Sequence, residues 1–197
     1  MKTATMNKLV GAALAGVVIT QLGGCAAAVV GGAAATGTAV ALDRRSTGVF
    51  IGDQEIEMRT KARMRDLFPI KVANSIAPTS FNRQVLLTGT VPDQATKDKA
   101  GDAAAAVQDV RKVFNELTVG GERAFGAGAN DAAITSAVKT RMLRDDRVPA
   151  TKIKIVTETN VVYLLGLVTR AEAAVATEVA RNTSAVSKVV VLFEYLD

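Results

Sequence analysis

The sequence predicts an α+β protein made of two copies of one small unit, each with the element order α-β-β-α-β. Three sequence blocks recur in the same order with nearly constant spacing, which indicates an internal repeat. At the start of the second copy, apolar residues recur every four positions, as in a helix packed on one side. Later segments alternate or run apolar, as strands do. We expect the two helices of each copy to cover one face of a three-stranded mixed sheet.

The spacing between the two copies is 78 residues in the first block, 77 in the second and 76 in the third. The blocks, first copy then second, are DQEIEMRTKARM (53–64) and DAAITSAVKTRM (131–142), QVLLTGTV (84–91) and VVYLLGLV (161–168), and DVRKV (109–113) and AVSKV (185–189). A unit of this size buries only about 60% of its unfolded surface. Packing of the two copies against each other would therefore stabilise both.

The first half of the second copy predicts a helix and two strands. We expect the helix over 131–146, because Ile134, Val138 and Met142 fall on one side of it. Two strands follow. The first carries isoleucines that alternate with lysines over 152–155, and the second is the apolar run 161–165.

The second half of this copy predicts a turn, a helix and a last strand. The turn is expected over 166–169. Thr169 is followed three residues later by Glu172, which is the spacing of a capping box at a helix start. Val175 and Val179 give that helix an apolar stripe, and the strand 189–196 closes the unit.

The beginning of the chain predicts export. Lys2 and Lys8 precede a short apolar run that ends at Leu22, and small residues follow, as in a secretory signal peptide. The alternative is an uncleaved membrane anchor, but the run is shorter and richer in Ala and Gly than the ~20 strongly apolar residues that a spanning helix needs. Leu22-Gly23-Gly24-Cys25 resembles the lipobox of bacterial lipoproteins. The resemblance implies that Cys25, the only cysteine, receives a diacylglycerol after cleavage.

These features divide the chain into five segments. They are a signal peptide (1–24), a lipidated tether rich in Ala and Gly (25–52), the first unit (53–119), a Gly-rich linker (120–130) and the second unit (131–197).

Composition excludes several classes of function. The chain has no histidine and one cysteine, so it lacks the usual general base, an intramolecular disulfide and a Cys-rich zinc site. Glu158, Glu172 and Glu178 have no base or nucleophile partner that the sequence identifies. We therefore expect no enzyme activity, no metal and no cofactor. Removal of Lys2 and Lys8 lowers the net charge from +5 to +3, and we expect no nucleic-acid binding.

The repeat resembles the BON domain, most specifically in NDAAITSAVKTRML (130–143) and VVYLLGLVTRAEA (161–173). Two such domains behind a lipobox are similar to the dual-BON outer-membrane lipoproteins of Gram-negative bacteria. The resemblance implies a non-enzymatic protein that binds anionic phospholipid such as phosphatidylglycerol or cardiolipin. It also implies roles in the outer-membrane barrier, in envelope stress tolerance and at the division site. Ala26, in place of the Asp of inner-membrane lipoproteins, implies an outer-membrane anchor and a body that faces the periplasm.

The resemblance implies that the first helix of the second domain contacts lipid. On a helical wheel Leu143 falls nearly opposite the apolar side, among cations, as in an interfacial helix. Ala133 stands where the family often has a large aromatic residue. The alternative is that Leu143 is an ordinary exposed leucine, and the wheel favours a core position for Ile134. The candidate lipid-binding residues are Leu143, Lys139, Arg147, Arg144, Arg141, Ser136, Ala133 and Ile134.

A second hypothesis is a lipid-anchored periplasmic scaffold. In that case Cys25 alone attaches the protein to the membrane, and the BON surfaces bind an envelope protein partner. The first helix of the first unit supports no separate lipid site, because its acidic residues nearly cancel its basic ones.

Overall fold

The structure is a computed structural model that describes residues 44–120 and 127–197. The residues from Asp43 onward form one compact unit. The predicted signal peptide, Cys25, most of the predicted tether and the middle of the predicted linker lie outside the described residues. Among the described helices, none has the length and apolar character needed to cross a bilayer.

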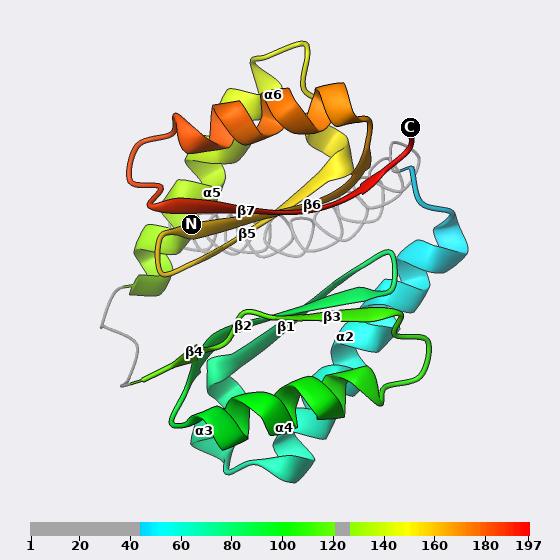
Figure 1. Cartoon of the computed structure of the whole chain (residues 1–197), viewed down its shortest axis with the longest axis vertical. Coiled ribbons are helices and arrows are strands. Elements are labelled where there is room, and N and C mark those ends of the chain that lie inside the picture. Colours follow the sequence, from blue (N-terminus) through cyan, green and yellow to red (C-terminus); the bar gives the residue numbers. More distant parts are fainter. Residues whose placement is uncertain (1–43, 121–126) are drawn as a thin grey trace, which may run out of the picture. The chain divides into compact units, whose positions relative to one another are not determined.

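The first repeat has two main helices on one face of a mixed sheet (Figure 1). Strand β1 is antiparallel to β2, and β3 and β4 are both parallel to β2. The elements are α2 (Thr47–Leu67), α3 (Ile70–Ser75), β1 (Ile76–Phe81), β2 (Gln84–Val91), α4 (Gln94–Ala105), β3 (Lys112–Asn115) and β4 (Thr118–Val119). The sequence did not predict α3 or the division of the last strand into β3 and β4.

The second repeat has the predicted order α-β-β-α-β, with α5 and α6 on the same face of the sheet β5-β6-β7 (Figure 1). Strand β6 is antiparallel to β5 and parallel to β7. The elements are α5 (Ala127–Leu143), the 3-10 helix η1 (Ala150–Lys152), β5 (Ile153–Glu158), β6 (Val161–Val168), α6 (Arg170–Arg181) and β7 (Lys188–Tyr195). Thr169 and Glu172 form the predicted capping box of α6.

The ends of three elements differ from the prediction. Helix α2 begins at Thr47, inside the predicted tether, because the Ser46 hydroxyl accepts the Val49 amide and caps the helix there. Helix α5 begins at Ala127, inside the predicted linker, and it ends at Leu143 instead of Asp146. Strand β6 continues to Val168, so the turn predicted over 166–169 is strand up to its last residue.

The two repeats share a glycine inside the central strand of each sheet, Gly89 in β2 and Gly166 in β6. In β2 the backbone carbonyl of Ser75 approaches Gly89 so closely that a Cβ there would lie 1.8 Å from its oxygen. In β6 the carbonyl of Lys152 is 3.0 Å from the equivalent point on Gly166. Each glycine therefore accommodates the backbone that enters the preceding strand, and neither marks a turn.

Each repeat also uses one helix aspartate to hold its hairpin. The Asp53 carboxylate accepts the backbone N–H groups of Asn82 and Arg83, each at 2.7 Å. The Asp131 carboxylate accepts those of Thr159 and Asn160, each at 2.9 Å. All four turn residues have positive φ, between 49° and 64°, as a two-residue hairpin turn requires. The aspartate that begins the repeated block thus has a structural role.

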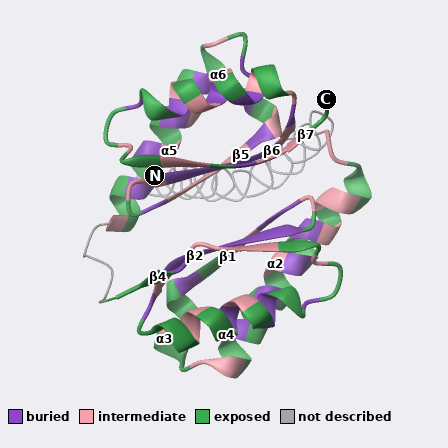
Figure 2. Cartoon of the chain, viewed as in Figure 1, coloured by how far each residue is buried: buried purple, intermediate pink, exposed green. Residues whose placement is uncertain are grey.

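Helices and sheet enclose a separate core in each repeat. Ile134, Val138 and Met142 of α5 are buried, as predicted, beside Val162 and Leu164 of β6. The first repeat has an equivalent core beneath α2 and α4. Buried positions follow the strands and the helix sides that face them (Figure 2).

A third apolar cluster lies on the other face of the two sheets. It contains Phe81 and Leu86 from the first repeat and Tyr163, Leu165 and Leu192 from the second. Strands β2 and β6 are therefore buried on both faces, which explains their continuous apolar sequences. Burial also raises the pKa of Tyr163 to about 12.

Candidate functional site on the outer face of α5

The outer face of α5 is the side of the helix turned away from the sheet. Leu143, the last helical residue, is 58% exposed there. Ser136 and Ala133 are exposed on preceding turns. Most of the exposed side chains on this face are small. They are Ala129, Ala132, Ala133, Ser136, Ala137 and Thr140. The face therefore presents one large apolar side chain at its C-terminal end.

The structure does not place Ile134 on this face. Its side chain is only 3% exposed and packs in the core of the second repeat. The prediction that Ile134 contacts lipid is therefore wrong, and the core position that the helical wheel favours is confirmed.

Lys139 is also placed differently from the prediction. Its ammonium group donates to the backbone carbonyls of Ala150 and Ile153, the latter at 3.0 Å. Burial lowers the pKa of this ammonium. The prediction of Lys139 as a cation for lipid phosphates fails because its charge is directed into the protein, where it fastens α5 to η1 and β5.

The three candidate arginines lie at the end of α5 and just beyond it. Arg141 and Arg144 are exposed. Arg147 donates from Nε and from one terminal nitrogen to the Asp145 carboxylate, at 2.9 and 2.7 Å. These hydrogen bonds raise the pKa of Arg147 and lower the pKa of Asp145. Arg147 is therefore partly neutralised by its neighbour.

A shallow polar hollow of about 670 Å³ lies beside these arginines. Its charged lining residues are Arg141, Arg144, Arg147, Asp145, Asp146 and Glu178. Acids and bases are balanced there, so the hollow itself has little preference for anions. Of the three arginines, Arg147 is held by Asp145, whereas Arg141 and Arg144 are exposed.

Within residues 44–120 and 127–197, no group of three or more His, Cys, Asp or Glu side chains is arranged to hold a metal ion.

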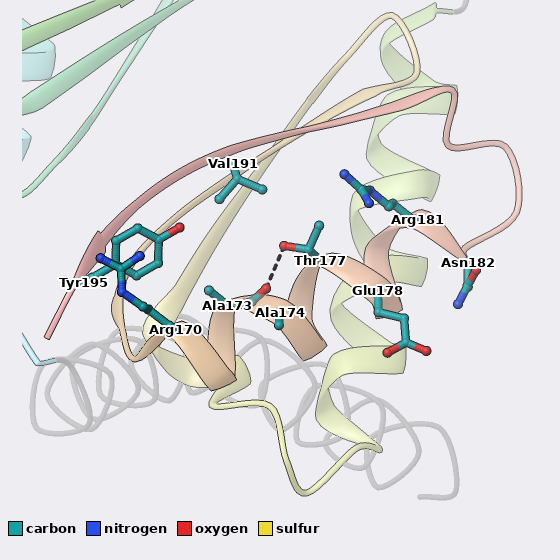
Figure 3. A pocket seen from close by; sticks show the side chains of 9 residues that line it. All are labelled: Arg170, Ala173, Ala174, Thr177, Glu178, Arg181, Asn182, Val191 and Tyr195. Carbon is teal, nitrogen blue, oxygen red and sulfur yellow. Dashed lines mark hydrogen bonds between the residues drawn. The ribbon is translucent and has the colours of Figure 1, made fainter. Parts of the chain in front are cut away.

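The sequence patterns did not predict a second surface, the groove between α6 and β7. Four residues of α6 at helical spacing, Arg170, Ala174, Thr177 and Arg181, form one side of a groove against β7 (Figure 3). Their spacing of four, three and four residues was a signal that could have found it.

Together, the two α-β-β-α-β units define a protein of two small, repeated α+β domains. The family model described as BON domain matches residues 52–121 and 130–197. The chain therefore belongs to the BON-domain family and carries two copies of the domain.

Relatives extend this result over most of the chain. Outer membrane lipoprotein DolP of Haemophilus influenzae is 40% identical over 176 residues, which cover 89% of this chain and 91% of the relative. A 21 kDa hemolysin of Actinobacillus pleuropneumoniae is 32% identical, covering 79% of this chain and 80% of that protein. Osmotically-inducible protein Y of Escherichia coli is 34% identical and covers 61% of each chain. The similarity to DolP supports the predicted outer-membrane, lipid-anchored location.

Proposed function

We propose that this dual-BON lipoprotein is a non-enzymatic membrane-binding protein whose second domain contacts anionic phospholipid through the outer face of α5. The observation that carries the proposal is Leu143, a large apolar side chain exposed at a helix end, with Arg141 and Arg144 beside it. An apolar residue among cations can enter the acyl boundary while the cations meet lipid phosphates.

The anchor and this face would act together. Acylation at Cys25 would hold the protein at the outer membrane, because two or three acyl chains give stable attachment. The helix contact would then orient the body against the periplasmic leaflet. In this role the protein would support outer-membrane integrity and envelope stress tolerance, including at the division site.

The proposal is tested with residues 43–197, which lack the lipid. We expect this body to bind vesicles that contain phosphatidylglycerol or cardiolipin, to bind neutral vesicles weakly, and to lose binding at high salt. Leu143→Asp removes the apolar contact and adds a negative charge, so it should abolish binding. The matched control is Ile70→Asp, because Ile70 is 65% exposed on the first repeat. Equal loss in both variants, or no binding by the unchanged body, would contradict the proposal.

The second candidate is the lipid-anchored scaffold, in which the BON surfaces bind an envelope protein partner. It is favoured by the balanced charges beside Arg147 and by the open groove of α6. The vesicle experiment separates the two functions. If Cys25 is the only membrane contact, residues 43–197 will bind no vesicle of either composition.

A further inference from the structure

Strand β7 ends the sheet of the second repeat as a long unprotected edge. In the described part of the chain its only strand neighbour is β6, with which it pairs at eight positions from Lys188 to Tyr195. An edge strand leaves every second set of backbone N–H and C=O groups directed away from the sheet, ready to pair with another strand. The equivalent edge of the first repeat is divided into the short strands β3 and β4, which is a common protection against such pairing.

A groove of about 510 Å³ runs between this edge and α6. Figure 3 shows Arg181 at one end, Arg170 beside the Tyr195 ring at the other, and Val191 with Thr177 between them. The Arg170 guanidinium lies 4.6 Å from the centre of that ring. The stripe Arg170, Ala174, Thr177 and Arg181 therefore puts a cation at each end and small side chains in the middle.

The first repeat shows that this groove is a specific feature of the second. At the offset of 76 residues, Thr177 corresponds to Gly101 and Val191 to Asn115. The Asn115 side chain donates to the Lys97 carbonyl at 2.7 Å. A Cβ at Gly101 would lie 2.7 Å from the same nitrogen. Asn115 thus fills the space between α4 and β3.

In the second repeat the corresponding space is open. Val191 remains 36% exposed and provides an apolar floor. The two ends of the stripe also differ in charge, because Arg170 and Arg181 correspond to Gln94 and Ala105 of the first repeat. The opening of the groove and its cationic ends occur together in one repeat only.

We propose that the groove between α6 and β7 binds an extended acidic peptide of a partner protein, which adds to the sheet as a strand beside β7. Main-chain hydrogen bonds to an edge strand supply affinity in this mode, and side-chain pockets supply selectivity. The peptide carries an apolar residue over Val191 and a carboxylate toward each of Arg170 and Arg181.

The spacing of the arginines sets the length of the peptide. Eleven residues of helix separate them, which is about 16 Å at 1.5 Å per residue. In an extended chain, residues four apart lie on the same face and about 13 Å from each other, and the long Arg and Glu side chains span the few ångströms that remain. The acidic residues of the ligand are therefore four apart, on the same face of its strand as an apolar residue midway between them.

A second copy of the chain fits this surface less well. Two β7 edges paired about a two-fold axis would place two α6 stripes side by side, with cations facing cations. Glu178 also lines the groove, but its carboxylate points away from Val191 in Figure 3, so Arg170 and Arg181 outnumber it. An acidic partner strand complements the groove, whereas a second copy repels it.

The test uses the full chain in nonionic detergent and three fluorescein-labelled peptides. The first is GETVTEG, the second replaces both Glu residues with Gln, and the third has N-methyl groups on alternate backbone nitrogens so that it cannot pair as a strand. We expect the acidic peptide to bind at least about tenfold more tightly than either of the others, the range of one to two charge-assisted contacts. Binding of the acidic peptide that is no tighter than that of the glutamine peptide would overturn the proposal.

Variants locate the binding. Arg181→Glu should weaken binding of the acidic peptide at least about tenfold. One of the two peptides with Lys in place of a single Glu should then bind better than the acidic peptide, because its other Glu still meets Arg170. Val191→Asn together with Thr177→Gly should close the groove as in the first repeat. Arg63→Glu, the same charge change at an exposed site on α2, is the control and should have no effect. Equal weakening by Arg63→Glu and Arg181→Glu would overturn the proposal.

This inference is independent of the lipid proposal, which depends on α5. Leu143→Asp should leave peptide binding unchanged, and Arg181→Glu should leave vesicle binding unchanged. If Arg181→Glu instead removed binding to phosphatidylglycerol vesicles, the groove would be part of a lipid surface and the peptide proposal would be wrong.

Discussion

At the scale of single residues, Asp53 holds together the start of the first domain and its hairpin. It is fully buried and accepts hydrogen bonds from the Ser80 hydroxyl and from two backbone N–H groups of the hairpin turn. It also forms an ion pair with Arg45 at 2.6 Å, and both side chains are almost inaccessible to water. The Arg45 guanidinium stacks 4.0 Å from the centre of the Phe81 ring. One carboxylate thus connects α2, β1 and the residues before the helix.

Loss of the Asp53 carboxylate should lower the free energy of unfolding. Asp53→Ala removes the buried ion pair with Arg45 and the acceptor of the Ser80 hydroxyl and of two hairpin N–H groups. Removal of one member of a buried pair typically costs about 3 kcal/mol or more. We expect urea unfolding of residues 43–197 to show a decrease of that size in the free energy of unfolding. Asp66→Ala, an exposed change on the same helix, should alter it by less than about 0.5 kcal/mol. Similar effects of the two substitutions would contradict this role of Asp53.

Glu172 makes the stability of the second domain sensitive to acid. Both oxygens of its carboxylate bind the Arg44 guanidinium at 2.7 Å, and one accepts the Thr169 amide. The hydrogen bond with Arg44 is the main cause that lowers its pKa from 4.5 to about 2. Because the pKa is lowered in the folded state, this stabilisation is complete above pH 4.5 and is lost as the pH falls toward 2.

The prediction is therefore a pH-dependent difference in Tm. Glu172→Gln should lower the Tm of residues 43–197 at pH 7, and the difference from the unchanged protein should shrink between pH 4.5 and pH 2. The control is Glu55→Gln, since Glu55 forms an exposed pair with Arg59 within α2. A Tm difference for Glu172→Gln that stays constant down to pH 2 would contradict the assignment.

At the scale of elements, the glycine of the central strand fixes how each sheet begins. Gly89 has φ of +120° and Gly166 does not have positive φ. A side chain at Gly89 would also collide with the Ser75 carbonyl. The equivalent positions therefore differ in their need for glycine, which is strict at Gly89 in β2 and milder at Gly166 in β6.

Alanine substitution should reveal this difference. Gly89→Ala combines a strained backbone with a clash against backbone, and we expect a loss of about 3 kcal/mol or more in the free energy of unfolding. Gly166→Ala should cost less, about 1 to 2 kcal/mol, because the Phe193 ring and the Lys152 carbonyl need only small shifts. Gly48→Ala meets open space on α2 and should be neutral or slightly stabilising. A smaller loss in Gly89→Ala than in Gly166→Ala would refute the explanation.

Much of the fold could be predicted because it depends on patterns among residues close together in the sequence. The four-residue spacing of Ile134, Val138 and Met142 and the Thr169 capping box depend on neighbours within one helix, and the structure confirms both. The first residues of α2 and α5 were not predicted as helix, because the Gly-rich and Ala-rich sequence around them suggested a flexible tether and linker. Helix α2 is instead fixed by a cap at Ser46 and by the buried Arg45–Asp53 pair.

The candidate site was predictable only in part, for the same reason. The helical wheel placed Leu143 outward, and its exposure agrees. It could not show that Lys139 turns inward, because the carbonyls that it binds arrive from η1 and β5, which follow α5 in the chain. The groove beside α6 depends on Val191, far along the chain, and on a comparison with Asn115 of the other repeat.

At the scale of the whole molecule, two similar domains have diverged into different surfaces. Each keeps its own core and its own hairpin-holding aspartate, and an apolar cluster from both sheets joins them. The Lys154 ammonium adds a polar contact between the repeats, to the Glu57 carboxylate at 2.7 Å. The second domain carries both the exposed Leu143 and the open groove of α6. In the first domain, Asn115 fills the corresponding space.

The measurement that tests lipid contact by α5 most directly is the environment of position 143 itself. Cys25 is the only cysteine in the chain, so residues 43–197 with Leu143→Cys can carry one polarity-sensitive fluorophore, and Ile70→Cys provides a matched control label. We predict a blue shift at position 143 when phosphatidylglycerol vesicles are added, reversed by high salt, and no shift at position 70. A label at 143 that stays in water while the protein sediments with vesicles, or equal shifts at both positions, would contradict the proposed membrane contact.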